Sequence, residues 1–493
     1  MAELYSHLGF IRNPFSTYSA EEECEFLDDI YIKPKFFHTL QSDIANGHSR
    51  FILGARGVGK TALISQLKTN LEKDNIFSII IDNFDGIPKD NNNTEFIRLI
   101  IEYLVKYYCI ELGNCPKRIR SLNRVQKEKL SFFISEFFVT ISSLEYTRLN
   151  NRTNIYHKTN CIKQIYNRFF NKPINYSISG CMEIASDFIR SHLGLPKVDK
   201  EIYYKNYLPE CEIKQSKQRE IPLNYRAYKS ILSDFAEIIQ KSGYKNVVIF
   251  FDKIDEFPQL NNNISLVANF LESLFKDTTI LMDCHYSIVF SIWDAIKPEL
   301  TNKGVRFDKI KPIDITWSNE EIKRIVEKRI SYFSRGRIVL DSLIRNQNKI
   351  DDLINLSNHS PRYVFRLFSY IYDCQSDKDD MAQAFESCII DKGVLLFCQN
   401  FDYYAIYPRS MGKVDVITNI NRLLKIGKTI IKTNDYVSTY KVSTPTAISY
   451  IRIALNYNLI KELPETDKGA KQYTINDPVI SHLIEAGITE LRK

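Results

Sequence analysis

The sequence predicts an α/β fold with a parallel sheet whose strands end at a phosphate-binding loop. The first observation is a strand, a glycine-rich loop and a helix between residues 50 and 73. The second is "NVVIFFDKIDEF", Asn246 to Phe257, an apolar run that ends in acidic residues. Continuous apolar runs are typical of parallel strands buried on both faces. Helical patterns and a final hairpin pattern fill the C-terminal third, which predicts additional domains.

The glycine loop lies in "FILGARGVGKTAL", Phe51 to Leu63, and matches the pattern G-x-x-x-x-G-K-[ST]. A strand that leads through glycines into a helix points several backbone N–H groups into one concavity, and the helix dipole adds positive charge there. A plain glycine turn is the alternative, but the flanking strand and amphipathic helix favour nucleotide binding. Lys60 is expected to reach the outer phosphates and Thr61 to bind Mg²⁺. The expected nucleotide-binding residues are Gly54, Ala55, Arg56, Gly57, Val58, Gly59, Lys60, Thr61 and Ala62.

The acidic residues after the second strand predict the metal and water chemistry. An open α/β sheet binds its ligand at the carboxyl ends of its strands, so Asp252 is expected beside the phosphates. There it can hold Mg²⁺ through water or the Thr61 hydroxyl, while Asp255 or Glu256 orients the attacking water. An exposed acidic turn is the alternative for "DKIDEF" alone. The glycine loop earlier in the chain favours the catalytic interpretation.

Three further strands are predicted at 75–86, 287–294 and 310–317, and three polar residues around them and beyond are candidates. Ser291, at a strand tip, can sense the terminal phosphate, with a solvent-facing serine as an equal alternative. Arg306, between two strands, can face a neighbouring subunit. Arg362 follows Pro361 in the first turn of a helix, a poor place for a cation, which suggests a phosphate partner, with a plain surface arginine as a comparable alternative.

Composition limits the class of protein. The 493 residues are 44% apolar and 25% charged, as in globular proteins of two to four domains. No run approaches the roughly 18 apolar residues of a membrane span, and the first residues lack a secretory pattern. We therefore expect a cytoplasmic protein without membrane contact. Ten cysteines without a C-x-x-C pair and eight scattered histidines predict reduced thiols and no zinc site.

Positive charge is concentrated in a predicted helical insertion at about 113–226. From Gly113 to Phe170, eleven Lys or Arg face three Glu, a net charge of +8 against +7 for the whole chain. With the interleaved aromatic residues, this stretch is a candidate surface for nucleic acid, such as duplex DNA, or for another polyanion. A helical insertion with a solvated basic face is at least as well supported. The basic residues at its start are Lys117, Arg118, Arg120 and Arg124.

The C-terminal third predicts helices and then a winged-helix pattern. Ser318 with Glu321 is a capping-box pattern, and helical periodicity continues to about residue 388. Near the end, Thr444 is predicted to cap a helix with Pro445 in its first turn, and a hairpin follows at 459–477. The predicted buried face of that helix is Ala447, Ile448, Ile451, Ala454 and Leu455. Its predicted outward face, which could read DNA or dock a protein, is Ser449, Tyr450, Arg452 and Asn456.

These motifs, in this order, resemble a known family. "GARGVGKT", "FFDKIDE", "VFSIWD" and "SPRYVFRL", closed by a winged helix, resemble the initiator-type AAA+ ATPases of the origin-recognition class and their bacterial relatives. The order is also similar to the STAND ATPases, and the leading "GFIRNPFSTYSAEEE" resembles the segment before the core in bacterial members. The resemblance implies a leading segment (1–45), an ATPase core (46–317), a helical lid (318–392) and a winged-helix domain (393–493).

The resemblance also implies roles for individual residues. Lys60 and Thr61 take the Walker A positions and Asp252 the Walker B position. Ser291 takes the sensor-1 position, Arg362 the sensor-2 position, and Arg306 is a candidate arginine finger. Two departures from the family pattern favour slow turnover. The carboxylates Asp252 and Asp255 are separated by two residues, and Trp293 stands where such strands often carry arginine.

The resulting expectation is a molecular switch of the AAA+/STAND type that binds and hydrolyses ATP with Mg²⁺. It would form a nucleotide-dependent homo-oligomer and regulate an effector protein or act on DNA, in phage defence or in a mobile element. One alternative is a DNA-binding initiator or loader. The other is a nucleotide-binding scaffold without turnover.

Overall fold

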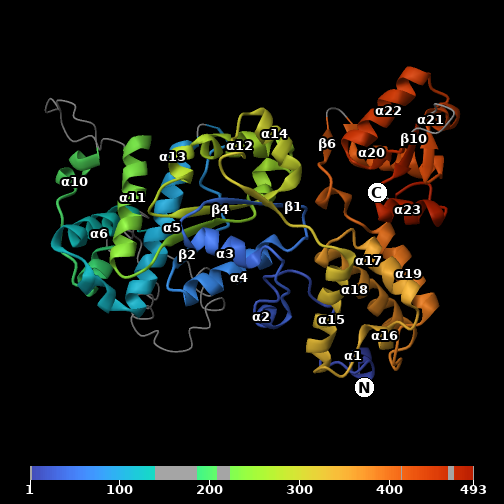
Figure 1. Ribbon diagram of the computed structural model, residues 1–493, viewed down its shortest axis with the longest axis horizontal. Coiled ribbons are helices and arrows are strands. Elements are labelled where there is room, and N and C mark those ends of the chain that lie inside the picture. Colours follow the sequence, from blue (N-terminus) through green and yellow to red (C-terminus); the bar gives the residue numbers. More distant parts are fainter. Residues whose placement is uncertain are drawn as a thin grey trace, which may run out of the picture.

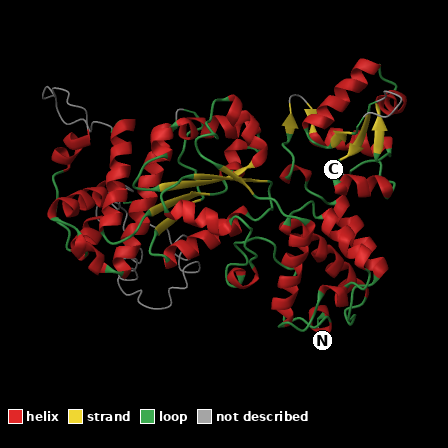
Figure 2. Cartoon of the chain, in the orientation of Figure 1, coloured by secondary structure: helices red, strands yellow, loops and turns green. Residues whose placement is uncertain are grey.

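The computed structural model describes residues 3–90, 92–138, 186–207, 223–411, 414–464 and 471–491. Two lobes are visible in Figure 1, one built around a parallel sheet and one mainly helical. Figure 2 shows the sheet of the first lobe enclosed by helices, and a smaller group of strands in the second lobe near the carboxyl terminus. No helix in these ranges is long and apolar enough to cross a membrane.

The five predicted strands of the first lobe are confirmed and form one parallel sheet. Its strands are β1 (Arg50–Gly54), β2 (Phe77–Ile81), β3 (Val247–Phe251), β4 (Ser287–Trp293) and β5 (Pro312–Asp314). Their order is β2-β3-β4-β1-β5, and every neighbouring pair is parallel. Because β4 lies between β1 and β3, the glycine loop and the acidic residues leave the same edge of the sheet on either side of it.

Helices cover both faces of this sheet, because side chains of successive strand residues point to opposite faces. Ile52 of β1 belongs to the core shared with α3 (Phe37–Ala45) and α4 (Lys60–Lys73). Its neighbours Phe51 and Leu53 belong to the opposite core. The helices of that opposite core are α5 (Asn93–Asn114), α11 (Tyr225–Lys241) and α12 (Ile264–Lys276).

The predicted insertion is continuous with these covering helices. α6 (Arg124–Phe137) packs on α5 and α11, α10 (Lys200–Tyr207) packs on α11 and α6, and α11 itself contacts β3. Residues 139–185 and 208–222 lie outside the described ranges. The smaller elements of this lobe are η1 (Pro116–Ser121), η2 (Ile254–Glu256), η3 (Pro258–Leu260), α13 (Thr278–Leu281), η4 (Asp294–Ile296) and α14 (Lys297–Asn302).

We refer to the helices that follow the sheet as the lid region, after their predicted role. They are α15 (Asn319–Ser334), α16 (Leu340–Leu343), α17 (Gln347–Leu356), α18 (Pro361–Lys378) and α19 (Ser387–Gln399). The capping box of Ser318 and Glu321 is present as predicted, and Ser360 caps α18. α19 crosses position 392, the predicted domain boundary, and packs closely on α18. A Cβ at Gly393 would lie 2.8 Å from the Ile371 Cα, so this helix crossing requires glycine.

The leading segment packs on the lid region. It contains α1 (Leu4–His7) and α2 (Leu27–Ile30), and Figure 1 shows the amino terminus beside the lid helices. Phe15 stacks on Phe368 of α18 with ring centroids 4.9 Å apart. The segment therefore joins the lid region before the chain enters the sheet.

The last part of the chain combines helices with a three-stranded antiparallel sheet of order β8-β10-β9. The predicted final hairpin is confirmed, whereas β8 and α21 were not predicted. Two other expectations are wrong: Ser443, not Thr444, is the N-cap residue of α22, and Ile448 is exposed because it faces away from the neighbouring helices. The elements are η5 (Tyr403–Ala405), β6 (Ser410–Met411), β7 (Val414–Asp415), α20 (Val416–Ile426), β8 (Ile430–Lys432), α21 (Thr433–Tyr440), α22 (Thr444–Asn456), β9 (Ile460–Glu462), β10 (Gln472–Ile475) and α23 (Pro478–Glu485).

Candidate nucleotide site

The glycine loop connects β1 to α4 as the motif predicts. Gly57 and Gly59 adopt φ values of 83° and 94°, which L side chains rarely accept. A Cβ at Gly57 would also lie 2.7 Å from the Ser360 hydroxyl oxygen, so the lid region leaves no room for a larger residue. Lys60 Nζ donates to the carbonyl oxygens of Gly54 and Ala55 at 2.9 and 3.1 Å. The ammonium group is thus held at the phosphate-binding loop.

Asp252 lies immediately after β3, beside the loop. Its side chain is almost fully buried, and burial raises the pKa of Asp252, while the nearby Thr61 and Ser291 hydroxyls and the Lys60 charge act in the opposite direction. Asp252 and Thr61 both line one cavity with Lys60. A carboxylate and a hydroxyl are hard oxygen ligands of the kind that Mg²⁺ prefers. The residues predicted for the metal therefore lie together.

Ser291 is fully buried in β4, two residues before the strand ends, so the solvent-facing alternative is wrong. It lies behind Asp252, and the cavity lining does not include it. Its hydroxyl makes no hydrogen bond of ordinary geometry within the described residues. The structure thus places Ser291 next to the predicted metal ligand and not on the cavity surface.

Arg56 makes a buried ion pair that sequence reasoning missed. Its Nε lies 3.1 Å from Asp255 Oδ2, and its Nη2 donates to the Asp255 carbonyl oxygen and to Asn262 Oδ1, both at 2.8 Å. The guanidinium also lies 4.9 Å from the ring centroid of Trp293. Both charged side chains are over 90% buried. Arg56 therefore connects the phosphate-binding loop to the turn after β3. The Asp255 carboxylate is occupied by its ion pair with Arg56.

Glu256 and Arg362 face the same cavity as Lys60 and Asp252. Burial raises the pKa of Glu256, and repulsion from Asp255 adds to this, while the charges on Arg362 and Arg56 lower it. The Arg362 backbone N–H donates to the Gly57 carbonyl oxygen at 3.3 Å. The start of α18 thus lies directly on the phosphate-binding loop.

The leading segment contributes a third wall of the cavity, which sequence reasoning did not predict. Tyr18, Ala20, Glu21 and Glu23 line it. Glu21 forms an ion pair with Lys253, the residue after Asp252. Burial raises the pKa of Glu21, but the hydrogen bond and charge of Lys253 outweigh that effect, so the pKa lies below its ordinary value. The cavity is therefore closed by the leading segment, the core and the lid region together.

Arg306 is not part of this cavity. It lies on the loop after α14, its side chain is 56% exposed, and it binds Asp308 through Nη2–Oδ2 and Nε–Oδ1 distances of 2.6 and 2.8 Å. An exposed position suits the predicted contact with a neighbouring subunit. Such a contact would have to replace or extend the pair with Asp308.

Some of the described basic residues of the insertion contact other side chains of the protein, and others are exposed. The Arg118 guanidinium lies 3.8 Å from the Tyr244 ring centroid and donates to Asn75 Oδ1 at 3.1 Å. Arg124 forms an ion pair with Glu128 on the helix surface. Lys117 and Arg120 are exposed. Because Arg118 is used in packing, it offers less to an external polyanion than the sequence alone suggested. The predicted basic residues that lie outside the described ranges are Arg148, Arg152, Lys158, Lys163 and Arg168.

The predicted outward face of α22 is largely exposed. Ser449, Arg452 and Asn456 are open to solvent. Tyr450 is half-buried, because the Arg422 guanidinium covers its ring at 3.9 Å from the centroid. Three of the four residues named from the sequence are therefore available to a partner.

Comparisons with known proteins identify no family for this chain. No protein-family model matches it, and no curated protein matches it. Solved structures with some similarity include Drosophila ORC bound to DNA, at 8% identity over 98% of this chain and 90% of that chain, with a TM-score of 0.30. A RuvB variant of Thermotoga maritima aligns at 17% identity over 52% of this chain and 83% of that chain, with a TM-score of 0.23.

Proposed function

We propose that this chain is a molecular switch of the AAA+/STAND type that binds and hydrolyses ATP with Mg²⁺. The observation that carries the proposal is the single cavity that brings Lys60, Thr61, Asp252, Glu256 and Arg362 together. Together these side chains supply a cation that would contact the phosphates, two ligands for the metal ion and a carboxylate that would orient the attacking water. The lid region adds a second cation. Phosphoryl transfer requires little beyond such positioning and charge stabilisation.

Each residue of the cavity would have its own role in binding and hydrolysis. The loop N–H groups and Lys60 would hold the outer phosphates, and Thr61 with Asp252 would hold Mg²⁺, which neutralises phosphate charge when bound. Glu256 would orient the attacking water and accept its proton. Arg362 would stabilise the terminal phosphate from α18, so that loss of this phosphate weakens the contact between the lid region and the loop. That differential contact is what a nucleotide-driven switch needs.

The test compares Lys60→Ala with Lys73→Ala, an exposed lysine at the end of the same helix. Calorimetry with Mg²⁺ and ATP is expected to show binding by the wild type and by the Lys73 variant, and at least a hundredfold weaker binding by the Lys60 variant. The reason is that the loop carbonyl groups of Gly54 and Ala55 hold the Lys60 ammonium where it would reach the phosphates. Unchanged affinity in Lys60→Ala would contradict the proposal.

A second candidate function is a DNA-binding initiator or loader. It is favoured by the exposed residues Lys117 and Arg120, and by Arg452 and Asn456 on α22 if the C-terminal part acts as a winged helix. Binding that neutralises phosphates releases counterions, so affinity for duplex DNA would fall steeply with salt, with a slope of about −0.9 per phosphate contact. A titration at several salt concentrations tests this candidate, and an absent response would remove it.

The switch would act as a nucleotide-dependent homo-oligomer that regulates an effector protein, with phage defence or a mobile element as its setting. Arg306 supports a role at the subunit interface because it is exposed and outside its own chain's cavity. Light scattering with Mg²⁺ and ATP is expected to show a larger assembly than without nucleotide. An oligomer unaffected by nucleotide would contradict this part of the proposal.

A further inference from the structure

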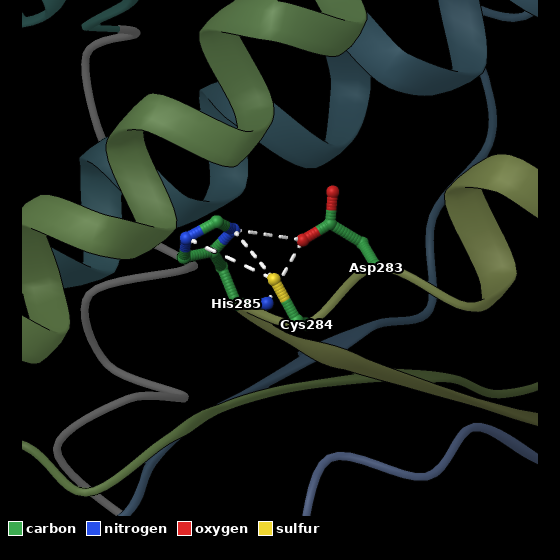
Figure 3. A group of neighbouring side chains, drawn as sticks. All are labelled: Asp283, Cys284 and His285. Carbon is green, nitrogen blue, oxygen red and sulfur yellow. Dashed lines mark hydrogen bonds and ion pairs between the residues drawn. The ribbon is translucent and has the colours of Figure 1, made fainter.

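The turn before β4 brings three different metal-ligating side chains together, as Figure 3 shows for Asp283, Cys284 and His285. One ligand atom from each of the three lies within 4.8 Å of the other two. Within the part of the chain that the structure describes, this is the one group of three or more such residues that is so close. The spacing is not a familiar zinc pattern, because the three residues are consecutive.

The contacts converge on a single nitrogen atom. His285 Nδ1 lies 3.1 Å from Asp283 Oδ1, 3.5 Å from Cys284 Sγ and 3.2 Å from Ser233 Oγ. An imidazole nitrogen carries either one proton or one lone pair, so it can satisfy only one of these neighbours at a time. A cation placed between the three side chains would be contacted by all of them.

The separations also match those between ligands of a tetrahedral ion. Zinc bonds of about 2.0–2.1 Å to nitrogen and oxygen and about 2.3 Å to sulfur place nitrogen and oxygen roughly 3.3 Å apart, and nitrogen and sulfur roughly 3.5 Å apart. The distances from His285 Nδ1 to Asp283 and Cys284 agree with these values to within a few tenths of an ångström. The side chains could therefore bind an ion with little rearrangement.

Neighbouring residues hold this turn in place. The His285 backbone N–H donates to Asp283 Oδ1 at 2.8 Å, which closes the turn. From α11, Ser233 donates to Asp283 Oδ2 at 2.8 Å and Gln240 donates to the His285 carbonyl oxygen at 2.9 Å. Contacts of this kind orient metal ligands and strengthen metal binding.

The group is open to solvent and far from the nucleotide cavity. Cys284 is exposed, and the side chains of Asp283 and His285 are 20% and 33% exposed. The turn precedes β4, whereas the phosphate-binding loop follows the carboxyl end of the parallel strand β1. At about 3.3 Å per residue, the length of β4 separates the two places by roughly 20 Å.

We propose that Asp283, Cys284 and His285 bind one borderline-soft divalent cation of the zinc class. A thiolate and an imidazole select such ions, whereas Mg²⁺ prefers oxygen ligands, so this site is distinct from the one proposed for Mg²⁺. Three protein ligands leave a fourth, solvent-facing position for water.

The experiment titrates the full-length, chelator-treated protein with Co²⁺ as a spectroscopic probe, and then with Zn²⁺. We expect one Co²⁺ per chain, a thiolate-to-cobalt charge-transfer band, and loss of this band when Zn²⁺ is added. Cys284→Ser is expected to remove the band and weaken Zn²⁺ binding at least tenfold. Cys115→Ser, at another exposed thiol, is the matched control and is expected to leave both unchanged.

A second variant separates ligand loss from misfolding. Asp283→Asn keeps an oxygen that can accept the His285 N–H but removes the charge, so it is expected to weaken Zn²⁺ binding at least tenfold with the turn preserved. Nucleotide affinity is expected to stay unchanged in both cluster variants, and the cobalt band is expected to persist in Lys60→Ala. Absence of cobalt binding, or a band that survives in Cys284→Ser, would overturn the proposal.

Discussion

At the residue scale, Arg56 determines which carboxylate after β3 is available for chemistry. Both carboxylates line the cavity, but Asp255 is almost fully buried and is bound by Arg56 through its side chain and its carbonyl oxygen. Asp255 and Glu256 were equal candidates by sequence for orienting water. The ion pair with Arg56 makes Asp255 a positioning residue and leaves Glu256 as the candidate base.

Glu256→Gln is expected to retain ATP binding and to lower kcat by roughly 10²–10⁴-fold, because the amide keeps the shape but cannot accept a proton. Single-turnover hydrolysis and calorimetry measure the two effects separately. Glu320→Gln, at an exposed position on α15, is the control. Unchanged turnover in Glu256→Gln would favour the scaffold without hydrolysis or a different base.

The pH dependence of turnover provides an independent check on Glu256. Burial raises its pKa above the ordinary value of 4.5. A base must be deprotonated, so kcat is expected to fall as pH decreases through this raised pKa, at a higher pH than for an ordinary glutamate. The residual activity of Glu256→Gln is expected to lack this acidic limb. An identical limb in both proteins would assign the titration to another group.

Breaking the Arg56–Asp255 pair is expected to be costly for stability. Arg56→Gln or Asp255→Asn leaves an unpaired buried charge, which costs about 3 kcal/mol of the free energy of unfolding. The double variant removes both charges, and its loss is expected to be smaller than the sum of the two single losses. Urea unfolding of all four proteins measures this coupling. Small, additive losses would show that the pair contributes little.

At the element scale, the leading segment connects the lid region to the core. Arg329 of α15 is buried, with Nη1 2.6 Å from Glu23 Oε1, Nη2 donating to the Thr17 carbonyl oxygen at 2.7 Å, and its guanidinium 4.2 Å from the Phe365 ring centroid of α18. The ion pair of Glu21 with Lys253 then reaches the end of β3. A contact chain therefore runs from α15 to the cavity.

Arg329→Gln is expected to release this segment, because Glu23 and two backbone carbonyl groups lose their buried donor. We expect a loss of about 3 kcal/mol in the free energy of unfolding and faster proteolytic cleavage near residues 14–26. Arg337→Gln, at an exposed position after the same helix, is the control. Cleavage at wild-type rates would mean that the packing of Phe15 on Phe368 suffices to hold the segment.

At the scale of the whole molecule, the cavity is closed by three parts of the chain that are far apart in sequence. The leading segment, the core and α18 each supply lining residues. A ligand that binds there contacts all three parts, so its affinity depends on their relative positions. Under the proposed function, this arrangement would couple nucleotide state to the position of the lid region.

The basic surface provides the whole-molecule test of DNA binding. Neutralising Lys117 and Arg120 together is expected to weaken binding to all DNA sequences and to flatten the salt slope by up to about 0.9 per lost phosphate contact. Changing Arg452 and Asn456 is expected mainly to alter sequence preference. Neutralising Lys309 and Lys311, both exposed, controls for net charge. Normal DNA binding with loss of a co-purifying protein would identify the basic residues as a docking surface.

Much of the fold and the centre of the site followed from local sequence. The five strands were predictable because apolar runs bounded by turn residues encode buried parallel strands, and the loop because its glycines supply the backbone conformations that turn requires. Lys60, Thr61 and Asp252 followed from the same motifs. The exceptions lie in the C-terminal part, where short elements such as β8 have no pattern of their own and depend on pairing with β10.

The sequence by itself determined the order of strands along the chain, the phosphate-binding loop and the helix starts at Ser318 and Pro361, because these depend on neighbouring residues. Only the tertiary structure decided that Arg56 binds Asp255, that Arg362 and Glu21 face one cavity, and that Asp283, Cys284 and His285 converge beside α11. The physical reason is that the packing of elements distant in sequence decides which charged side chains lie within contact distance. Arg56 and Asp255 are 199 positions apart, and no local pattern encodes which buried charges will meet.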